Sequence, residues 1–312
     1  MIVHVVKKIF VLWVIGDGKP GHLNQSLGLA DAISRQVTCE TYQISLTHKK
    51  GYLARIKAAL QAAANLPKPD IVIGAGHATH VPLVWISKKY KARSILVMRP
   101  SLPRGLFDLC IAPEHDFPQC GGQKKLILTQ GALNRIAPPP ATDRSVQMIL
   151  IGGPSKIHDW DGNALLLALK EITATGKWRL TDSRRTPAGF TEEIRKHLPH
   201  IEIFPHQQTN PNWLTESFAD AANIWVTEDS VSMIYESLSS GAKVGLLPVP
   251  RSKSDSRVLL GLEKIIAGGF VTRFSDWLTH RQLKAAPELL READRCAAQV
   301  IRDFGLTEND AG

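Results

Sequence analysis

The stretch of residues 223–250, NIWVTEDSVSMIYESLSSGAKVGLLPVP, constrains the fold more than any other, because it reads as strand, helix and strand. Residues 224–226 form a short apolar run that is typical of a buried parallel strand. Gly241, which adopts a left-handed conformation without penalty, is expected to end the helix, and a second buried strand begins at Lys243. The helix has one apolar stripe, formed by Val231, Ile234, Tyr235 and Leu238. A strand–helix–strand unit of this kind predicts an α/β fold with a parallel sheet.

The polar residues of this stretch stand where parallel sheets bind ligands. Glu228 follows the first strand, and open α/β sheets bind ligands at the carboxyl ends of their strands. Asp229 or Ser230 is expected to cap the helix, whose free N–H groups and positive dipole end attract phosphate. Ser232 and Glu236 share a helix face, one turn apart and off the apolar stripe. The alternative interpretation is a solvated helix face with an ordinary cap.

The spacing from Glu228 to Glu236 resembles the E-x7-E element of nucleotide-sugar glycosyltransferases with the GT-B fold. That fold has two Rossmann-like parallel-sheet domains that face a cleft. The resemblance implies that Glu228 meets the donor sugar and that Glu236 binds the ribose hydroxyls.

The length of 312 residues favours two domains of about 150 residues each. The clearest linker is IAPPPATDRS at 136–145, because three consecutive prolines cannot continue a helix or a central strand. We therefore expect Rossmann-like domains at about 1–138 and 144–286. A final amphipathic helix within 287–312 is expected to return to the first domain.

The net charge of +9 is distributed unevenly along the chain. Residues 1–140 contain 18 Lys or Arg against 7 Asp or Glu, whereas the remainder contains 20 against 22. A basic first half favours an anionic partner, such as lipid headgroups, a phosphorylated glycan or nucleic acid. Together with the glycosyltransferase resemblance, this favours an anionic acceptor or an anionic membrane surface, and nucleic acid is not expected.

The cysteines and the apolar segments indicate where the protein works. Its four cysteines show no metal-ligand spacing and no dense disulfide pattern, which fits a reducing cytoplasm. The apolar run at 9–15 is only about one strand long and leads into a glycine turn, unlike a signal peptide. No segment approaches the roughly 20 apolar residues of a membrane span. We expect a cytoplasmic protein, peripheral at the inner face of the membrane at most.

The first strand, at 9–15, leads into a glycine-rich loop whose spacing matches the dinucleotide fingerprint G-x-G-x-x-G. If Asn24 caps the following helix, Gly21 falls before that helix and not in its first turn. The acid that would hold a ribose is also missing after the second strand, near 41–46. The loop is therefore expected at the mouth of a cleft rather than around NAD. Its polar residues are Asp17, Lys19 and His22.

Histidines follow a later strand of the first half. The strand at 70–74 ends in GAGHATH, so His77 and His80 are expected at the same sheet edge as His22. A single histidine is usually a satisfied structural residue, but two on one strand-end loop favour a cleft position. Strands expected at 94–98 and 109–112 alternate with helices, as parallel βαβ units require.

The second half begins with a strand at 147–151 and continues with the loop GGPSKIHDWDGN. Gly153, with the glycine before it, would let the backbone approach a phosphate, and Lys156 would add charge. The loop lacks the Walker ending GK[ST], so it is not an ATPase loop. Asp159 and Asp161 form a D-x-D, but Asp161 is better explained as a helix cap, and no metal is expected.

The next strand, at 178–181, ends in TDSRRTP. Arg184 and Arg185, with Ser183 before them, would suit a diphosphate, because guanidinium groups bind phosphate oxygens in pairs. The alternative is a solvated basic turn.

The motifs DGKPGHLNQSLGLADAI, GGPSK, TDSRRTP and TEDSVSMIYESL, in this order, resemble the elongated-mitochondria family. Its plant members take part in mitochondrial fission, and its bacterial members are of unsettled activity. The resemblance covers nearly the whole chain and implies a relative of GT-B glycosyltransferases. Leu23 departs from the family pattern, which more usually has an acidic residue at this position.

These observations favour a glycosyltransferase that uses a nucleotide-sugar donor and no cofactor. Arg184, Arg185, Lys156 and the helix after Glu228 would stabilise the leaving diphosphate without a metal. If transfer inverts the anomeric centre, Asp17 or His22 would supply the base. One alternative is a non-catalytic adaptor with a vestigial nucleotide cleft. Another is an NAD-dependent epimerase, but none of the four tyrosines has the Tyr-x-x-x-Lys spacing that it requires.

Overall fold

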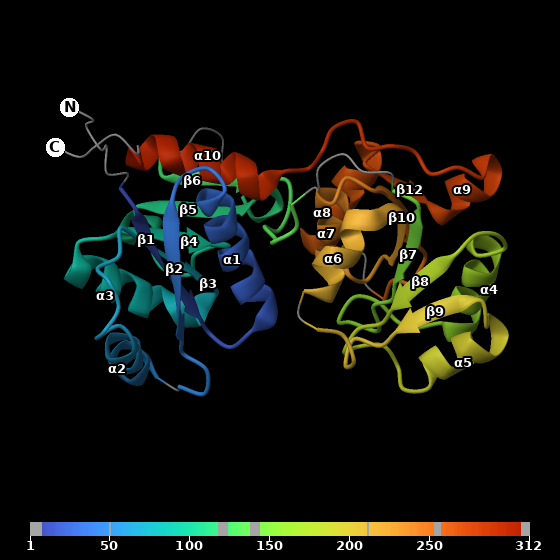
Figure 1. Ribbon diagram of the computed structural model, residues 1–312, viewed down its shortest axis with the longest axis horizontal. Helices are drawn as coiled ribbons and strands as arrows, with labels where there is room; N and C mark the ends of the chain where they lie inside the picture. The colour runs from blue at the N-terminus through green and yellow to red at the C-terminus, as the bar shows by residue number, and fades with distance from the viewer. Residues whose placement is uncertain are drawn as a thin grey trace, which may run out of the picture. The chain divides into compact units, whose positions relative to one another are not determined.

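Figure 1 shows the computed structural model of the chain, which describes residues 8–49, 51–117, 124–137, 144–210, 212–252 and 257–306. The chain divides into two compact units. Unit 1 comprises Met1–Arg135 with Arg291–Gly312, and unit 2 comprises Ile136–Leu290. The centre of the expected proline linker, residues 138–143, lies outside the described residues. Within the described part of the chain, no helix is long and apolar enough to span a bilayer.

Unit 1 contains a six-stranded parallel sheet in the order β2-β1-β3-β4-β5-β6, with helices on both of its faces (Figure 1). Its strands are β1 (Phe10–Gly16), β2 (Cys39–Ser45), β3 (Ile71–Ala75), β4 (Arg93–Val97), β5 (Leu109–Pro113) and β6 (Leu126–Thr129). Its helices are α1 (Pro20–Ser34), α2 (Tyr52–Ala62), α3 (His80–Tyr90) and α10 (Glu292–Phe304), with short 3₁₀ turns η1 (His77–Thr79), η2 (Arg104–Leu106) and η3 (Glu114–Asp116).

The side chains of β1 alternate between the two faces of this sheet, as the period of two requires. Leu12 and Val14 pack into the cluster that contains α1 and α10. Trp13 and Ile15 point the other way, into the cluster that contains α2 and α3. Helix α10 lies against α1, although more than 250 residues separate them in sequence (Figure 1).

Unit 2 contains a second six-stranded parallel sheet, in the order β12-β11-β10-β7-β8-β9. Its strands are β7 (Val146–Leu150), β8 (Trp178–Thr181), β9 (Ile201–Phe204), β10 (Ala221–Thr227), β11 (Lys243–Leu247) and β12 (Val271–Arg273). Its helices are α4 (Gly162–Ile172), α5 (Phe190–His197), α6 (Trp213–Asp220), α7 (Val231–Ser239), α8 (Arg257–Ala267) and α9 (Phe274–His280).

The core of unit 2 also has two layers. Met148 and Leu150 of β7 pack with α6, α7 and α8, whereas Ile149 packs with α4 and α5. The carboxyl-terminal parts of β7 and β10 are buried without interruption, as a parallel sheet covered on both faces requires. The fold class expected from the strand–helix–strand pattern is confirmed in both units.

Each sheet has one point at which the strand order reverses. In unit 1 it lies between β1 and β3, and in unit 2 between β7 and β10. Loops leaving the carboxyl ends of strands at such a point diverge and leave a crevice in which ligands bind. Ligand sites are therefore expected at the loops after β1 and β3 and at the loops after β7 and β10.

The start of one helix and the capping of another differ from the sequence prediction. Helix α1 begins at Pro20 and not at Asn24, so Gly21 lies inside the first turn. Proline is favoured at the first position of a helix because its φ is already helical and its missing N–H is not needed there. Helix α7 has no side-chain cap from Asp229 or Ser230. By contrast, the expected cap of α4 is confirmed, since Asp161 Oδ1 accepts from Ala164 N at 2.9 Å.

Candidate functional site

A cavity of about 630 Å³ opens in unit 2 at the carboxyl ends of β8 and β9 and at the start of α7. This volume is in the range of small-molecule sites. Its polar lining residues are Thr181, Asp182, Ser183, Arg184, Arg185, His206, Thr209, Asn210, Ser230 and Ser232. Its apolar lining residues are Trp213, Leu214 and Met233.

The polar wall combines a cation with a helix N-terminus. Arg184 is exposed at the cavity, and among the described residues no ion pair joins it to a carboxylate. Ser230 and Ser232 bring the first turn of α7 to the same cavity, and that turn contains no acidic residue. The first N–H groups of a helix have no partner within it and favour anions. This wall can bind a phosphate or diphosphate.

Another part of the lining is aromatic and apolar. Trp213 lies at the start of α6, and its ring centroid is 4.9 Å from that of Phe204 on β9. Leu214 and Met233 complete this part of the cavity. Such a surface can take the flat face of a nucleobase, because aromatic rings stack on bases of any sequence.

A histidine–carboxylate pair belongs to the same cavity. His206 follows β9 and Asp182 follows β8, and Asp182 Oδ1 lies 2.9 Å from His206 Nδ1. The same oxygen accepts from the backbone N of His206 at 2.7 Å. Asp182 thus holds both the loop and the imidazole ring, and it fixes which ring nitrogen faces the carboxylate.

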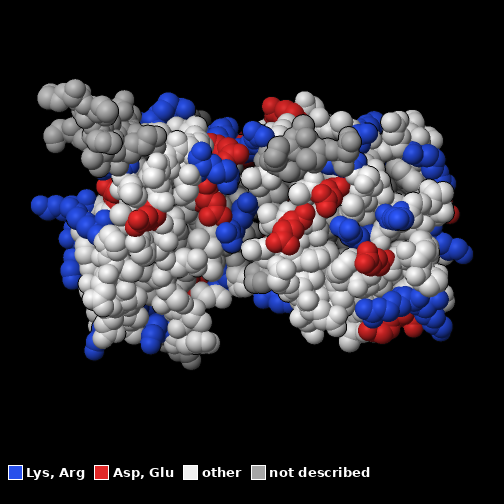
Figure 2. All heavy atoms as spheres, in the orientation of Figure 1, with Lys and Arg blue, Asp and Glu red and all other residues white. Residues whose placement is uncertain are grey.

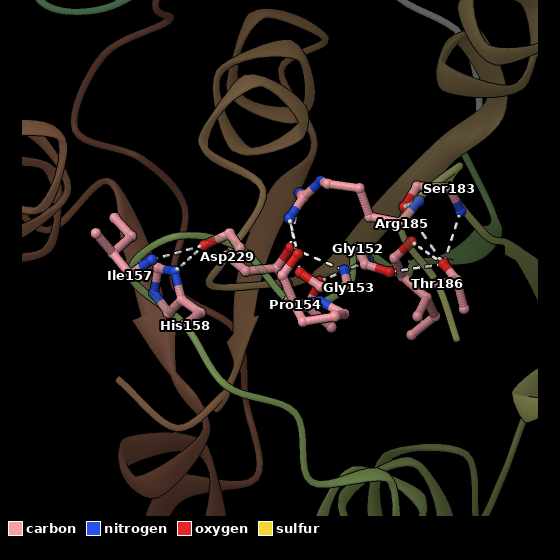
Figure 3. Close-up of polar contacts among 12 residues, drawn as sticks. Gly152, Gly153, Pro154, Ile157, His158, Ser183, Arg185, Thr186 and Asp229 are labelled. Atoms are coloured by element: carbon pink, nitrogen blue, oxygen red, sulfur yellow. Dashed lines mark hydrogen bonds and ion pairs between the residues drawn. The ribbon is translucent and has the colours of Figure 1, made fainter. Parts of the chain in front are cut away.

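Arg185 joins the three loops that meet at the reversal point of unit 2 (Figure 3). Its Nη1 donates to the carbonyl of Gly153 at 2.6 Å, in the loop after β7. Its Nη2 donates to Asp229 Oδ2 at 2.7 Å, in the loop after β10. The side chain of Asp229 has no exposed surface, whereas that of Arg185 is 40% exposed. This ion pair, the Arg185 clamp, fixes the geometry of the cavity's edge.

The two glycines after β7 are required by protein contacts. Gly152 N donates to Thr227 Oγ1 at 2.7 Å, and Gly153 N donates to Asp229 Oδ2 at 2.9 Å. A side chain at Gly152 would overlap the Asp229 carboxylate, and one at Gly153 would overlap the backbone of Arg185. The glycine amide that we expected to meet a phosphate is therefore engaged by a buried carboxylate.

Thr186 fastens the TDSRRTP loop to the loop after β7 (Figure 3). Its Oγ1 donates to the carbonyl of Gly152 at 2.6 Å and accepts from Ser183 N at 2.9 Å. The loop fixed in this way presents Ser183 and Arg184 to the cavity. Arg185 also borders the cavity, so the two adjacent arginines differ in what they contact.

The two glutamates of the E-x7-E spacing lie outside this lining. Glu228 forms an ion pair with Arg251, at 2.9 Å between Oε2 and Nη2, and only 13% of its side chain is exposed. Arg251 also binds Glu263, at 2.7 Å. Glu236 lies one turn beyond Ser232 on α7 and is half-buried. Lys156 is exposed on the loop after β7 and does not line the cavity.

Unit 1 has its own polar pair at its reversal point. His22, on the first turn of α1, places Nδ1 2.9 Å from Oδ2 of Asp17, which follows β1. The Asp17 side chain is 3% exposed and that of His22 is 20% exposed. Gly76, after β3, passes so close that a side chain there would overlap the His22 ring. A buried carboxylate thus orients a partly exposed imidazole, the arrangement of a positioned base.

The two histidines of the loop after β3 differ in exposure, because His77 is exposed and His80 is buried. His80 is 2% exposed and its Nδ1 lies 3.0 Å from Ser101 Oγ. Burial, with a smaller effect of the neighbouring His77, lowers the pKa of His80 from 6.5 to about 4. His80 is consequently neutral near pH 7 and belongs to the core side of this loop.

Part of the cavity lining was predicted from the sequence, and the rest was missed. Ser183, Arg184, Arg185, Ser230 and Ser232 do meet at one cavity. Asp182 and His206 were missed, although each follows a strand's carboxyl end, which is the signal that would have found them. Trp213, Leu214 and Met233 were missed because apolar helix residues give no sequence signal for a binding wall.

Comparisons with known proteins identify relatives of the whole chain. The family model described as "Mitochondrial fission ELM1" matches residues 20–304. The Rickettsia prowazekii protein named "Uncharacterized protein RP120" is 26% identical, over 96% of this chain and 99% of that protein.

Solved structures share the fold at low identity. MurG of Acinetobacter baumannii superposes with a TM-score of 0.54 at 12% identity, covering 96% of this chain and all of that chain. A UDP-GlcNAc 2-epimerase of Neisseria meningitidis, bound to UDP-GlcNAc, has a TM-score of 0.58 at 11% identity, with 96% and 100% coverage. The two sheets therefore form a GT-B fold.

Proposed function

Because the chain belongs to the mitochondrial fission ELM1 family and has the GT-B fold, we propose that it is a nucleotide-sugar-dependent glycosyltransferase. Its acceptor is an anionic or lipid-linked molecule, such as a cell-envelope glycan. The observation that carries this proposal is the cavity of about 630 Å³ at the start of α7, which combines an apolar wall with a cationic one.

The donor nucleotide binds in unit 2. Its base lies against Trp213 and Met233, and its diphosphate lies between Arg184 and the first turn of α7. Both phosphate-binding groups act where negative charge grows as the sugar–phosphate bond breaks, so they stabilise the departing diphosphate. Ser183 and Ser230 add hydroxyl donors at the same edge. Glu236 is assigned to the ribose, as the resemblance to the E-x7-E element implies.

Arg185 acts through the other residues. Since its guanidinium is bound to Asp229 and to the Gly153 carbonyl, it positions the loop that carries Arg184. Arg185 is a positioning residue in this proposal, and Arg184 is the diphosphate ligand. Lys156 and Glu228 remain candidate donor contacts from the sequence, and Glu228 would have to exchange its Arg251 partner to reach a sugar.

The acceptor side is assigned to unit 1. Asp17 orients His22 through the 2.9 Å contact to Nδ1, which leaves Nε2 to take a proton from an acceptor hydroxyl. The hydroxyl oxygen then attacks the anomeric carbon, and the bond from that carbon to the diphosphate oxygen breaks. The 11 excess positive charges of residues 1–140 favour an acceptor that carries phosphate or carboxylate groups. Work at the inner face of the cytoplasmic membrane fits such an acceptor.

Nucleotide binding tests the proposal directly. The Neisseria epimerase is described as bound to UDP-GlcNAc, so uridine diphosphate and its sugars are the first probes, followed by guanosine diphosphate. A ligand at about 100 times its dissociation constant stabilises a protein by roughly 2.7 kcal/mol, which a melting curve detects. Arg184→Ala should weaken the binding of the nucleoside diphosphate about tenfold and that of the free nucleoside much less. Lys170→Ala, an exposed cation on α4, is the matched control.

A second candidate is a non-catalytic adaptor, and one observation favours it. Glu228 and Asp229, the two carboxylates after β10, are both held by arginines of the chain itself. An adaptor has no need to retain nucleotide affinity. If no nucleoside diphosphate or nucleotide sugar shifts the melting curve, the transferase proposal fails and the adaptor is preferred. A bound donor that is only isomerised would instead indicate an epimerase.

A further inference from the structure

Residues 41–107 of unit 1 form an almost acid-free segment. They contain 11 Lys or Arg and one carboxylate, Asp70. Asp70 lies just before β3, where its Oδ2 accepts from Val11 N at 2.8 Å, so its charge is directed at the amino end of the sheet. Nearly the whole positive excess of the first 140 residues therefore comes from this segment, which includes α2 and α3.

The same segment exposes large apolar side chains. Leu53 is 84% exposed and Tyr52 is 50% exposed on the first turn of α2, and Trp85 is 56% exposed on α3. Leu106, in the η2 turn, is 40% exposed. Single exposed apolar residues are ordinary, but here four of the nine exposed large apolar side chains of the described residues lie within one basic segment.

The two helices present these side chains with their lysines. Leu53 and Lys57 are one turn apart on α2, and both are exposed. Trp85 stands one turn before the exposed Lys88 and Lys89 on α3. Helices α2 and α3 contact each other and cover the same sheet face. We name this surface the α2–α3 face, defined by Tyr52, Leu53, Lys57, Trp85, Lys88 and Lys89.

The opposite helical layer of unit 1 has a different charge pattern. There Arg35 pairs with Asp294, and Arg295 pairs with Glu292. Among the described residues, no ion pair involves a side chain of α2 or α3. In Figure 2 the part of the surface at the lower left, where α2 and α3 lie, shows blue spheres among white ones. The cations of the α2–α3 face thus have no carboxylate partner in the part of the chain that the structure describes.

We infer that the α2–α3 face docks the protein on an anionic phospholipid bilayer. Lysines attract an anionic surface, and neighbouring leucine and tryptophan side chains enter the interfacial region, where tryptophan and tyrosine are favoured. Charge complementarity selects this occupant over a neutral apolar partner, and the protruding Leu53 and Trp85 select it over a nucleic acid, whose backbone offers nothing apolar. This docking does not depend on nucleotide binding in unit 2.

A row of rings connects this face to the sheet edge. Tyr52 lies 6.4 Å from His77, His77 lies 5.5 Å from His80, and His80 lies 5.8 Å from Phe107, measured between ring centroids. His77 directly follows Gly76, the residue that touches the His22 ring. The face thus adjoins the Asp17–His22 pair within unit 1, which suits an acceptor that remains in the bilayer.

Vesicle sedimentation with the full chain tests the inference. Vesicles of phosphatidylcholine with phosphatidylglycerol should bind the protein, and pure phosphatidylcholine vesicles should bind it at least about tenfold more weakly. Binding should fall as salt rises from about 0.1 M to about 0.5 M. Leu53→Ser with Trp85→Ser, and separately Lys57→Glu with Lys89→Glu, should each weaken binding about tenfold or more.

The controls are exposed residues of unit 2. Leu167, 67% exposed on α4, and Lys196, exposed on α5, are changed to Ser and Glu in the same way, and binding should not change. All variants alter exposed side chains, so their melting temperatures should match the wild type. If the variant Leu53→Ser with Trp85→Ser does not fold, the variant Lys57→Glu with Lys89→Glu still tests the inference.

Insertion has a spectroscopic readout of its own. Trp85 is exposed, whereas Trp13, Trp178 and Trp225 are buried. Bromine-labelled lipid should therefore quench part of the tryptophan fluorescence of the wild type, and this quenching should be absent in Trp85→Phe. Three results overturn the inference: equal binding to neutral and anionic vesicles, loss of binding only in the unit 2 controls, or binding to duplex DNA at physiological salt without binding to vesicles.

Discussion

The guanidinium of Arg185 lies 2.7 Å from the carboxylate of Asp229, which has no exposed surface although it stands at the edge of a cavity-bearing sheet. A buried carboxylate is tolerated only when it is paired and hydrogen-bonded, and here Gly153 N supplies a further bond at 2.9 Å. The adjacent Arg184 has no such partner among the described residues. Neighbouring arginines of one loop therefore divide into one that holds the loop and one that is available to a ligand.

The first prediction separates these arginines. Arg185→Ala should lower the free energy of unfolding by about 1–3 kcal/mol, because it leaves Asp229 buried without its cation. Arg184→Ala should change it by no more than about 0.5 kcal/mol, since its side chain is exposed. Urea unfolding of both variants measures the difference. Equal stability losses would show that the Arg185 clamp is not structural.

The second prediction concerns Gly153. An added methyl group would overlap the backbone of Arg185, which cannot move like a side chain, so Gly153→Ala should cost about 1–3 kcal/mol. Gly21→Ala is the control, because nothing lies near its Cβ position and it occupies a helix, where alanine is favoured by up to about 1 kcal/mol. Denaturation midpoints of the two variants should move in opposite directions. Matching shifts would contradict the close approach.

The third prediction concerns Glu236, which we assign to the ribose of the donor. Glu236→Gln keeps the shape and helix propensity of the side chain, so the melting temperature should stay within a few degrees of the wild type. Loss of charge-assisted bonds to two hydroxyls should weaken nucleotide binding about tenfold. Calorimetric titration of both proteins with the same nucleotide gives the answer. Unchanged affinity on an intact fold would remove Glu236 from the site.

The fourth prediction is a pH dependence that comes from His80. Its pKa is lowered by burial to about 4, so between that value and 6.5 the unfolded chain binds a proton that the folded chain does not. Stability therefore falls as the pH drops through this window. His80→Gln lacks this contribution, so the melting-temperature gap between wild type and variant should narrow from about pH 7 to about pH 5. Parallel profiles would mean that His80 does not titrate in this way.

Much of the fold was predictable because parallel sheets leave strong local signals. The apolar run and helix stripe around Ile224 and Ile234 predicted β10 and α7, and Gly241 ends α7 with a φ of +78° as expected. The start of α1 was predicted wrongly at Asn24. Proline at the first helical position, not a side-chain cap, starts this helix, and the cap rule overlooked Pro20.

The candidate site was less predictable because its contacts join distant segments. Arg185, Gly153 and Asp229 each stood out, but their mutual bonds cross up to 76 residues of sequence. From the sequence, a glycine at the end of a strand predicts a phosphate-binding loop. The structure shows that the N–H of Gly153 donates to the carboxylate of Asp229. Trp213 likewise reads as an ordinary helix residue until the cavity beside β9 is known.

Helix α10 has a consequence for how the chain is made. Its residues Cys296, Ala297 and Val300 are completely buried against the first-half helix α1, so they complete a core begun nearly 300 residues earlier. Synthesis proceeds from the N-terminus at about 5–20 residues per second, so the apolar surface of α1 waits many seconds for its cover. Unit 2, continuous in sequence, is finished during that time. A ribosome that stops before residue 291 would release a chain whose second unit is whole and whose first is open.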